Sequence, residues 1–178
     1  MANDMQDSAA RASRVRLMIF DVDGILTDGS LHFGPEGEAL KSFNVLDGHG
    51  IKLLQQSGVA TAIVSARQSP IVTRRASDLG ISHVHQGVHD KRSAFDQLLN
   101  DTGVSMDACG FIGDDVIDLP ILARVGFAVS VPNGHPDVKS RVHYVTQAGG
   151  GRGAAREICD FILRAQGKYD SMLAAYLE

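Results

Sequence analysis

Three short strand candidates that each run into polar side chains constrain the fold of this chain most strongly. They cover residues 15–20, 59–64 and 108–112 and are rich in the apolar side chains that buried strands carry. The polar residues that follow them are, in chain order, Asp21 and Asp23, Ser65 and Arg67, and Asp114, Asp115 and Asp118. In open α/β sheets, ligands bind outside the carboxyl ends of the strands. The three polar clusters are therefore predicted to converge on one site.

The rest of the chain alternates in the same way, which predicts an α/β fold: a parallel sheet with helices on both faces. Helices are expected over 50–57, 70–79, 91–100 and 153–166, and further strands over 81–85, 126–130 and 142–145. The turn sequence GPEG at 34–37 lies between two short strand candidates and predicts a small β-hairpin flap at about 29–44. The expected organisation is a disordered lead-in over 1–13, a single main domain over 14–167 and a C-terminal tail over 168–178.

Composition excludes several classes of function. The net charge is −4 and there is no basic block, which argues against nucleic acid or an anionic membrane surface as the partner. The two cysteines, Cys109 and Cys159, form no CxxC motif, so a reducing cytoplasm is the expected compartment. The longest apolar runs are too short to cross a bilayer.

The first polar cluster carries the chemistry that these residues best support. Asp21 and Asp23 are two apart, so an extended backbone points both carboxylates to one side, where they repel each other unless a cation lies between them. Asp114 would complete an all-oxygen site of the kind that suits Mg²⁺. One carboxylate of such a pair can attack phosphorus as a nucleophile, and the other can transfer protons.

Each piece also has a purely structural interpretation. Ser65 is placed to bind a phosphoryl oxygen, but a serine after a strand is more often a helix cap. Lys91 is placed to neutralise charge, but a lysine that opens a helix is usually a solvated surface residue. Asp114, Asp115 and Asp118 are typical of a helix start. Because all four pieces occur in order where a strand meets the next element, we favour the catalytic interpretation.

These pieces together resemble the four motifs of the haloacid dehalogenase superfamily. DVDGILT at 21–27 is similar to the first motif, Ser65 to the second, Lys91 to the third and GDDVID at 113–118 to the fourth. The resemblance implies a Rossmann-like fold, with Asp21 as nucleophile and Asp23 as general acid and base. It further implies Mg²⁺ held by the side chains of Asp21 and Asp114 and the backbone carbonyl of Asp23. Asp115 and Asp118 would then support the metal's waters and the lysine.

Finer features resemble the capless 3-deoxy-D-manno-octulosonate 8-phosphate phosphatases of this superfamily. The spacing between motifs leaves no room for a cap domain, and the stretches 28–31, 47–51, 65–67 and 149–157 are similar to that family. The resemblance implies a bacterial cytoplasmic enzyme of lipopolysaccharide precursor biosynthesis that acts on an acidic sugar phosphate. It also implies a homotetramer whose sites are completed by neighbouring subunits through hairpins and C-terminal tails. The implied substrate-binding residues are Thr27, Asp28, Gly48, His49, Arg67 and Arg152.

Other interpretations stay open from the sequence. A nine-carbon sialic-acid-type sugar 9-phosphate would use the same catalytic residues, and a non-catalytic oligomerisation module is a less favoured possibility. His49 stands where the family commonly has an aromatic residue, which leaves specificity open. The glycines at 149–151 suit either a flexible hinge or a mobile lid. Zinc at His83, His85 and His89 is conceivable, but a carboxylate-rich site favours magnesium.

Overall fold

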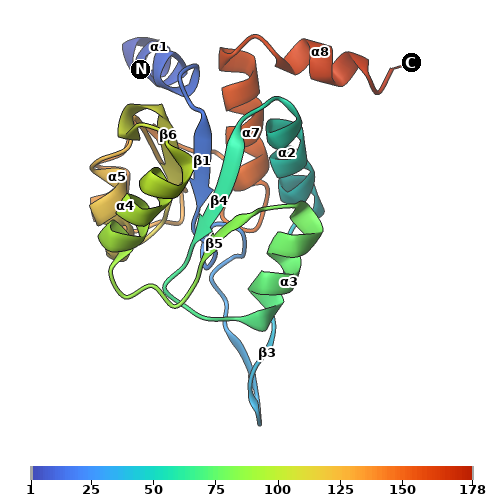
Figure 1. Cartoon of the computed structure of the whole chain (residues 1–178), viewed down its shortest axis with the longest axis vertical. Helices are drawn as coiled ribbons and strands as arrows, with labels where there is room; N and C mark the ends of the chain where they lie inside the picture. The colour runs from blue at the N-terminus through green and yellow to red at the C-terminus, as the bar shows by residue number, and fades with distance from the viewer. Residues whose placement is uncertain (1, 178) are drawn as a thin grey trace.

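A six-stranded parallel sheet forms the centre of the protein in the computed structural model, which describes residues 2–177 (Figure 1). The strands lie in the order β5-β4-β1-β6-β7-β8. Their bounds are β1 (Leu17–Phe20), β4 (Ala60–Val64), β5 (His83–His85), β6 (Cys109–Ile112), β7 (Phe127–Ser130) and β8 (Tyr144–Val145). Every predicted strand of the sheet is present, and each is shorter than predicted. The α/β prediction is confirmed.

The strand order reverses direction at β1, which lies between β4 and β6. Phe20 pairs with Ile63 on one side and with Ile112 on the other, so the three strands end at almost the same level. The residues that follow them are thereby brought to one edge of the sheet. A reversal of this kind opens a crevice at the carboxyl ends of the strands.

Helices cover both faces of the sheet because alternate strand residues point to opposite sides. Met18 and Phe20 face one apolar cluster, and Leu17 and Ile19 face the other. The first cluster is covered by α2 (Val45–Gln56), α3 (Pro70–Leu79) and α7 (Ala154–Ala165), and the second by α4 (Lys91–Thr102), α5 (Leu119–Leu122) and α6 (Pro136–Lys139). Both layers are visible in Figure 1.

Helix α2 begins at Val45, five residues before its predicted start. The side chain of Asn44 caps it by accepting a hydrogen bond from the backbone amide of Leu46. Two glycines in the first turns lower the helix propensity there, and this hid the true start. Gly50 is needed for close packing, because a Cβ at this position would lie 3.1 Å from the Cα of Arg156 in α7.

The prediction of a disordered lead-in over 1–13 was wrong for the described residues, because α1 (Ala2–Ala12) is a helix packed on the body. Ala12 is fully buried in the apolar cluster that α7 also covers. The hydroxyl of Ser8 donates to the carbonyl of His143, and Arg11 donates to the carbonyl of Gly126. Small side chains allow this contact without the apolar run that sequence patterns detect.

The predicted hairpin is confirmed and projects beyond the carboxyl ends of the sheet strands (Figure 1). It consists of β2 (His32–Gly34) and β3 (Gly37–Leu40), paired antiparallel. Its apolar side chains are unusually open, with Phe33 63% exposed. At the opposite end of the molecule the predicted tail contains α8 (Tyr169–Ala174). Among the described residues, no helix has the length and apolar character needed to span a membrane.

Candidate active site

A buried lysine between two carboxylates lies where β1 ends. Lys91 is the first residue of α4, and its ammonium donates to Asp21 Oδ1 at 2.9 Å and to Asp118 Oδ1 at 2.5 Å. The side chains of Asp21, Lys91 and Asp118 are 7%, 2% and 0% exposed. Burial acts to lower the pKa of Lys91, but the two carboxylates outweigh it and raise the pKa. Lys91 is therefore a buried cation that fixes the orientation of Asp21, and its interpretation as a surface lysine was wrong.

The second oxygen of Asp118 organises the loop after β6. It accepts hydrogen bonds from the backbone amides of Asp114 at 3.0 Å and Asp115 at 3.1 Å. Gly113 makes room for this, since a Cβ there would lie 2.6 Å from the Asp118 carboxyl carbon. Both oxygens of Asp118 are thus engaged, and Asp118 positions its neighbours. Asp115 in turn caps the short turn that follows it.

Asp21 and Asp114 form the part of the site that fits a divalent cation. Oxygen atoms of Asp21, Asp114 and Asp118 lie within 4.8 Å of one another. Burial first, and then the charge of Asp118, raise the pKa of both Asp21 and Asp114 to about 7. A hard divalent cation relieves such repulsion between carboxylates. Gly24 preserves the space, because a Cβ at this residue would lie 2.1 Å from Asp114 Oδ2.

A cavity of about 150 Å³ opens directly onto these carboxylates. Six of the predicted site residues line it: Asp21, Asp23, Ser65, Arg67, Asp114 and Asp115. Ala66 and Ile117 complete the lining. The sequence prediction that the three strand ends share one site is confirmed geometrically. After the role that the sequence predicts for its residues, we call this space the phosphoryl cavity.

Ser65 lies in the wall of the phosphoryl cavity and is not a helix cap. It is buried, its amide donates to the carbonyl of His85, and its carbonyl accepts from Val88. The next helix, α3, begins only at Pro70 and has Ser69 in the capping position. The capping interpretation of Ser65 was therefore wrong, and its hydroxyl is available at the cavity wall.

Asp23 belongs to a different set of contacts from Asp21. Its Oδ1 accepts a hydrogen bond from Lys41, which follows β3, and its Oδ2 lies 3.8 Å from Arg67. Lys41 also pairs with Glu38 at 2.9 Å, and Arg67 lies 4.0 Å from the same carboxylate. Sequence reasoning missed Lys41 and Glu38 because no motif marks them. Their only signal was two charges in a hairpin expected beside the site.

The predicted substrate-binding residues Asp28 and Arg152 lie outside the phosphoryl cavity. They face each other at 3.5 Å and line a neighbouring hollow of about 500 Å³ together with Pro132, Asn133, Gly149 and Gly150. Thr27 is buried, and its hydroxyl oxygen accepts a hydrogen bond from the amide of Gly29. Thr27, the last residue of the first motif, thus shapes the turn that leads to Asp28 at this hollow.

The glycine-rich stretch after β8 is packed tightly against the first motif. A Cβ on Gly150 would lie 1.7 Å from the carbonyl oxygen of Gly24, and the amide of Gly151 donates to the carbonyl of Ile25. Asp47 secures the same stretch by accepting hydrogen bonds from the amides of Gly153 and Arg156. In this structure the stretch is therefore closely packed and held by hydrogen bonds. The glycines allow this close packing, a role that neither the hinge nor the lid interpretation anticipated.

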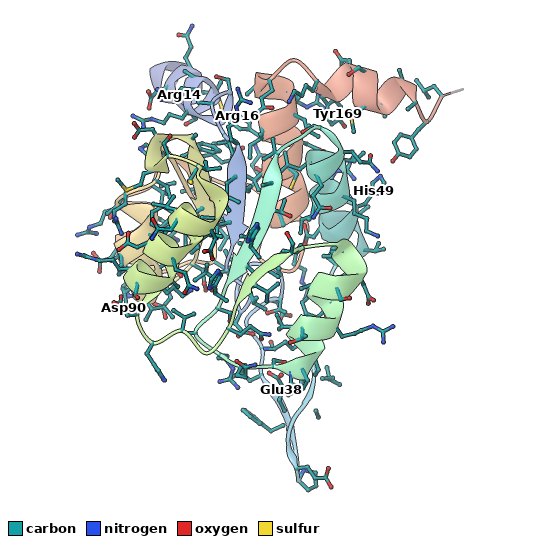
Figure 2. The ribbon with its side chains drawn as sticks, viewed as in Figure 1. Arg14, Arg16, Glu38, His49, Asp90 and Tyr169 are labelled. Carbon is teal, nitrogen blue, oxygen red and sulfur yellow. The ribbon has the colours of Figure 1, made fainter. Side chains whose placement is uncertain are left out.

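Gly48 and His49 do not reach the phosphoryl cavity within one chain. Gly48 faces Arg75 of α3. His49 contacts Tyr176 with ring centroids 5.6 Å apart, in a separate cavity of about 130 Å³ beside α8. Figure 2 shows His49 on the outer side of α2, away from Glu38 at the base of the hairpin. A contact between His49 and substrate stays a prediction.

Among the described side chains, the group that can offer three ligand atoms to a metal consists of the aspartates Asp21, Asp114 and Asp118. Among the residues that the structure describes, the histidines at 83, 85 and 89 do not form such a group. The donor chemistry is thus entirely carboxylate, which favours a hard cation over zinc.

Comparison with known proteins agrees with this geometry. Residues 78–158 match the model of haloacid dehalogenase-like hydrolases. Over 164 residues the chain is 44% identical to the 3-deoxy-D-manno-octulosonate 8-phosphate phosphatase of Escherichia coli. The aligned residues cover 92% of this chain and 87% of that relative. The chain belongs to the haloacid dehalogenase-like hydrolases.

Two solved structures of this hydrolase family extend the likeness to the fold. The 3-deoxy-D-manno-octulosonate 8-phosphate phosphatase of Yersinia pestis has a TM-score of 0.90 at 45% identity, over 92% of this chain and 89% of that one. The enzyme of the same description from Moraxella catarrhalis has a TM-score of 0.94 at 42% identity, over 97% and 99%. The Moraxella structure is a complex with a magnesium ion, a phosphate ion and a KDO molecule.

Proposed function

We propose that this protein is a Mg²⁺-dependent phosphatase. It hydrolyses 3-deoxy-D-manno-octulosonate 8-phosphate to the free sugar acid and phosphate through an aspartyl-phosphate intermediate. The observation that carries the proposal is the buried Asp21–Lys91–Asp118 cluster beside Asp114 at the carboxyl edge of the sheet. The relatives of the same description, one of them bound to magnesium, phosphate and KDO, support the choice of metal and substrate.

In the first half of the reaction, the carboxylate of Asp21 attacks phosphorus and the bond to the sugar oxygen breaks. Asp23 donates a proton to that oxygen, and the free sugar acid leaves. In the second half, Asp23 takes a proton from water as the water attacks the aspartyl-phosphate. Phosphate is released and Asp21 is restored. Splitting one displacement into two in this way is the advantage of covalent catalysis.

The remaining residues hold the reacting groups in place. Lys91 fixes Asp21 through the 2.9 Å hydrogen bond and counters the charge of the phosphoryl group. The Ser65 hydroxyl and nearby amides bind phosphoryl oxygens. Asp21 and Asp114 side chains, with the Asp23 carbonyl, would hold Mg²⁺, which supplies positive charge against those oxygens. Asp115 and Asp118 support this arrangement.

Recognition of the sugar is assigned to groups outside the buried cluster. Arg67 lines the rim of the phosphoryl cavity with its guanidinium partly exposed, which suits an acidic sugar. Asp28 and Arg152 line the neighbouring hollow, and Thr27 shapes the turn that holds Asp28. Gly48 and His49 would take part only where a neighbouring subunit brings them to a site.

The finer expectations are a bacterial cytoplasmic location, a role in lipopolysaccharide precursor biosynthesis and a homotetramer with shared sites. The exposed apolar side chains of the hairpin support an assembly, since Phe33 and Leu40 lie open in a single chain. A chain cut after Gln166 loses α8, so its kcat/KM should fall if the tail completes a neighbour's site. An unchanged kcat/KM would limit the tail to packing.

The substrate is tested by phosphate release from the eight-carbon 8-phosphate and from a nine-carbon sugar acid 9-phosphate. We expect the higher kcat/KM for the eight-carbon ester, with turnover lost in EDTA and restored by Mg²⁺. A higher kcat/KM for the nine-carbon ester would overturn the substrate assignment. Turnover of neither ester with Mg²⁺ present would overturn the proposal of a sugar phosphatase and favour a non-catalytic module.

A further inference from the structure

The base of the hairpin contacts Asp23, a residue in the wall of the phosphoryl cavity, through one lysine. The side chain of Lys41, immediately after β3, is 1% exposed, whereas the side chain of its partner Asp23 is 19% exposed. The Lys41 ammonium bonds to Asp23 Oδ1 and, at 2.9 Å, to Glu38 Oε1. An ammonium on a side chain with so little exposure is costly unless it is paired, and Asp23 and Glu38 provide that pairing.

Glu38 ties that lysine to the body of the protein. Its second oxygen accepts a hydrogen bond from the hydroxyl of Ser69, the residue before α3. Arg67 lies beside the same network, 4.0 Å from Glu38 and 5.9 Å from the ring of Phe33 in the hairpin. The position of the hairpin is therefore linked to the position of Asp23 through a continuous set of charged contacts.

The contacts of Asp23 leave one of its oxygens available. Lys41 bonds to Oδ1, while Arg67 approaches Oδ2 only to 3.8 Å, which is too long for a hydrogen bond. Asp23 receives nothing from Lys91, whose hydrogen bonds go to Asp21 and Asp118. With Oδ1 bound to Lys41, Oδ2 accepts no hydrogen bond among the described residues, and Asp23 lines the cavity.

We propose that Lys41 is a positioning residue that fixes the carboxylate of Asp23 for proton transfer, so that the hairpin forms part of the catalytic machinery. The proposal rests on the function proposed above, in which Asp23 protonates the leaving oxygen. Holding a catalytic group in its productive geometry contributes a large part of the rate, and loss of that hold lowers kcat. Lys41 itself transfers no proton.

The test compares two esters that differ in their need for an acid. The sugar 8-phosphate has an alcohol leaving group that must be protonated, whereas p-nitrophenyl phosphate has a leaving group that departs as the anion. The measured quantity is the rate of leaving-group release in the first turnover with Mg²⁺, because the second half of the reaction is the same for both. The variants are Lys41→Met, Lys41→Arg and Asp23→Asn, with Lys52→Met on the exposed face of α2 as the matched control.

Lys41→Met should slow release of the sugar at least about 100-fold, within the usual range for loss of general acid catalysis, and slow p-nitrophenolate release by less than about fivefold. Asp23→Asn should give the same pattern, Lys41→Arg should recover part of the loss, and Lys52→Met should match the wild type. Equal losses on both esters would reduce Lys41 to a structural residue and overturn the proposal, as would no loss on either. If the wild type releases neither leaving group, the proposed function itself fails.

Discussion

The two sides of the phosphoryl cavity are built in different ways. On the inner side, Asp21, Lys91 and Asp118 are almost completely buried and are positioned by the ends of two central strands and the start of a helix. On the outer side, Asp23 is partly exposed and is held by Lys41, which follows a two-stranded hairpin with open faces. Asp21 on the inner side and Asp23 on the outer side are nevertheless only two residues apart in the chain.

This difference separates the two halves of the proposed chemistry. The nucleophile depends on the core of a single chain, because burial and the paired lysine fix it. The proton-transfer group depends on a peripheral element that a single chain leaves largely uncovered. We therefore expect changes on the inner side to affect chemistry and folding strongly, and changes on the outer side to affect mainly rate and assembly.

Asp21→Asn should have the largest effect on activity. The amide cannot attack phosphorus, so kcat should fall at least about 1,000-fold in a phosphate-release assay, as for other lost nucleophiles. The fold should survive, because Lys91 keeps Asp118 and the change removes one carboxylate whose pKa is raised by burial and by Asp118. Residual activity within about tenfold of the wild type would contradict the role of the inner side.

Lys91→Met should have the largest effect on stability. It leaves Asp21 and Asp118 buried without their cation, a change that costs about 3–5 kcal/mol and lowers Tm by roughly 6–20 °C. Differential scanning calorimetry measures the shift. The matched control is the double variant Lys91→Met/Asp118→Asn, which removes one of the unpaired charges and should recover part of the loss. A Tm unchanged in the single variant would show that the inner cluster does not depend on the lysine.

Added Mg²⁺ should stabilise the protein more at pH 8 than at pH 5.5. Burial and Asp118 raise the pKa of Asp21 and Asp114 to about 7, from an ordinary value of 3.8, in the metal-free chain. The contribution of these groups to stability is therefore full below about pH 4 and is lost as pH rises through about 7. At 100 times its Kd, the ion contributes about 2.7 kcal/mol, or roughly 5–10 °C in Tm.

The control for the metal is the Asp114→Asn variant, which should show a smaller shift with Mg²⁺ at pH 8. Thermal melts with and without Mg²⁺ at both pH values give the shift in Tm of the wild type and of the variant at each pH. An equal shift in the wild type and in the variant would place the ion elsewhere on the protein.

Phe33→Asp on the outer side should have the smallest effect. The ring is exposed in one chain, so Tm of the dilute protein should change by less than about 2 °C, as is usual for surface substitutions. If hairpins pair between subunits, the mass measured by light scattering should fall and kcat/KM should drop. The matched control is Met106→Asp, another exposed apolar residue, away from the hairpin. An unchanged mass would argue against the hairpin as an interface.

The inner side was predictable from the sequence because its residues follow buried strands. A parallel sheet brings such positions to one edge, so Asp21, Ser65 and Asp114 were correctly expected to share a site. The pattern did not reveal that Lys91 is buried, because a lysine at a helix start is usually solvated. Its role came from the resemblance to a known set of motifs.

The outer side was not predictable in the same way. Lys41 and Glu38 lie in a hairpin whose contacts with the body depend on tertiary packing, and their charges resemble those of any exposed strand. The stretches around His49 and Arg152 were expected at the substrate. In the structure, Asp47 caps the turn after Arg152, so the two stretches meet each other. Motif similarity marked these stretches, but it did not reveal that they pack against each other across long separations in the chain.

The reversal of strand order at β1 has a consequence for how such a protein can change. Loops leave the edge beside Asp21 toward both faces of the sheet. The hairpin precedes α2, and the 65–67 turn follows β4. Inserted or altered sequence in either loop would overhang the cavity while the strands beneath keep their register. Because Ser65 and Arg67 share one of these segments and Lys41 follows the hairpin on the other, a change that altered selectivity at the rim would also act on the groups that carry the proposed reaction.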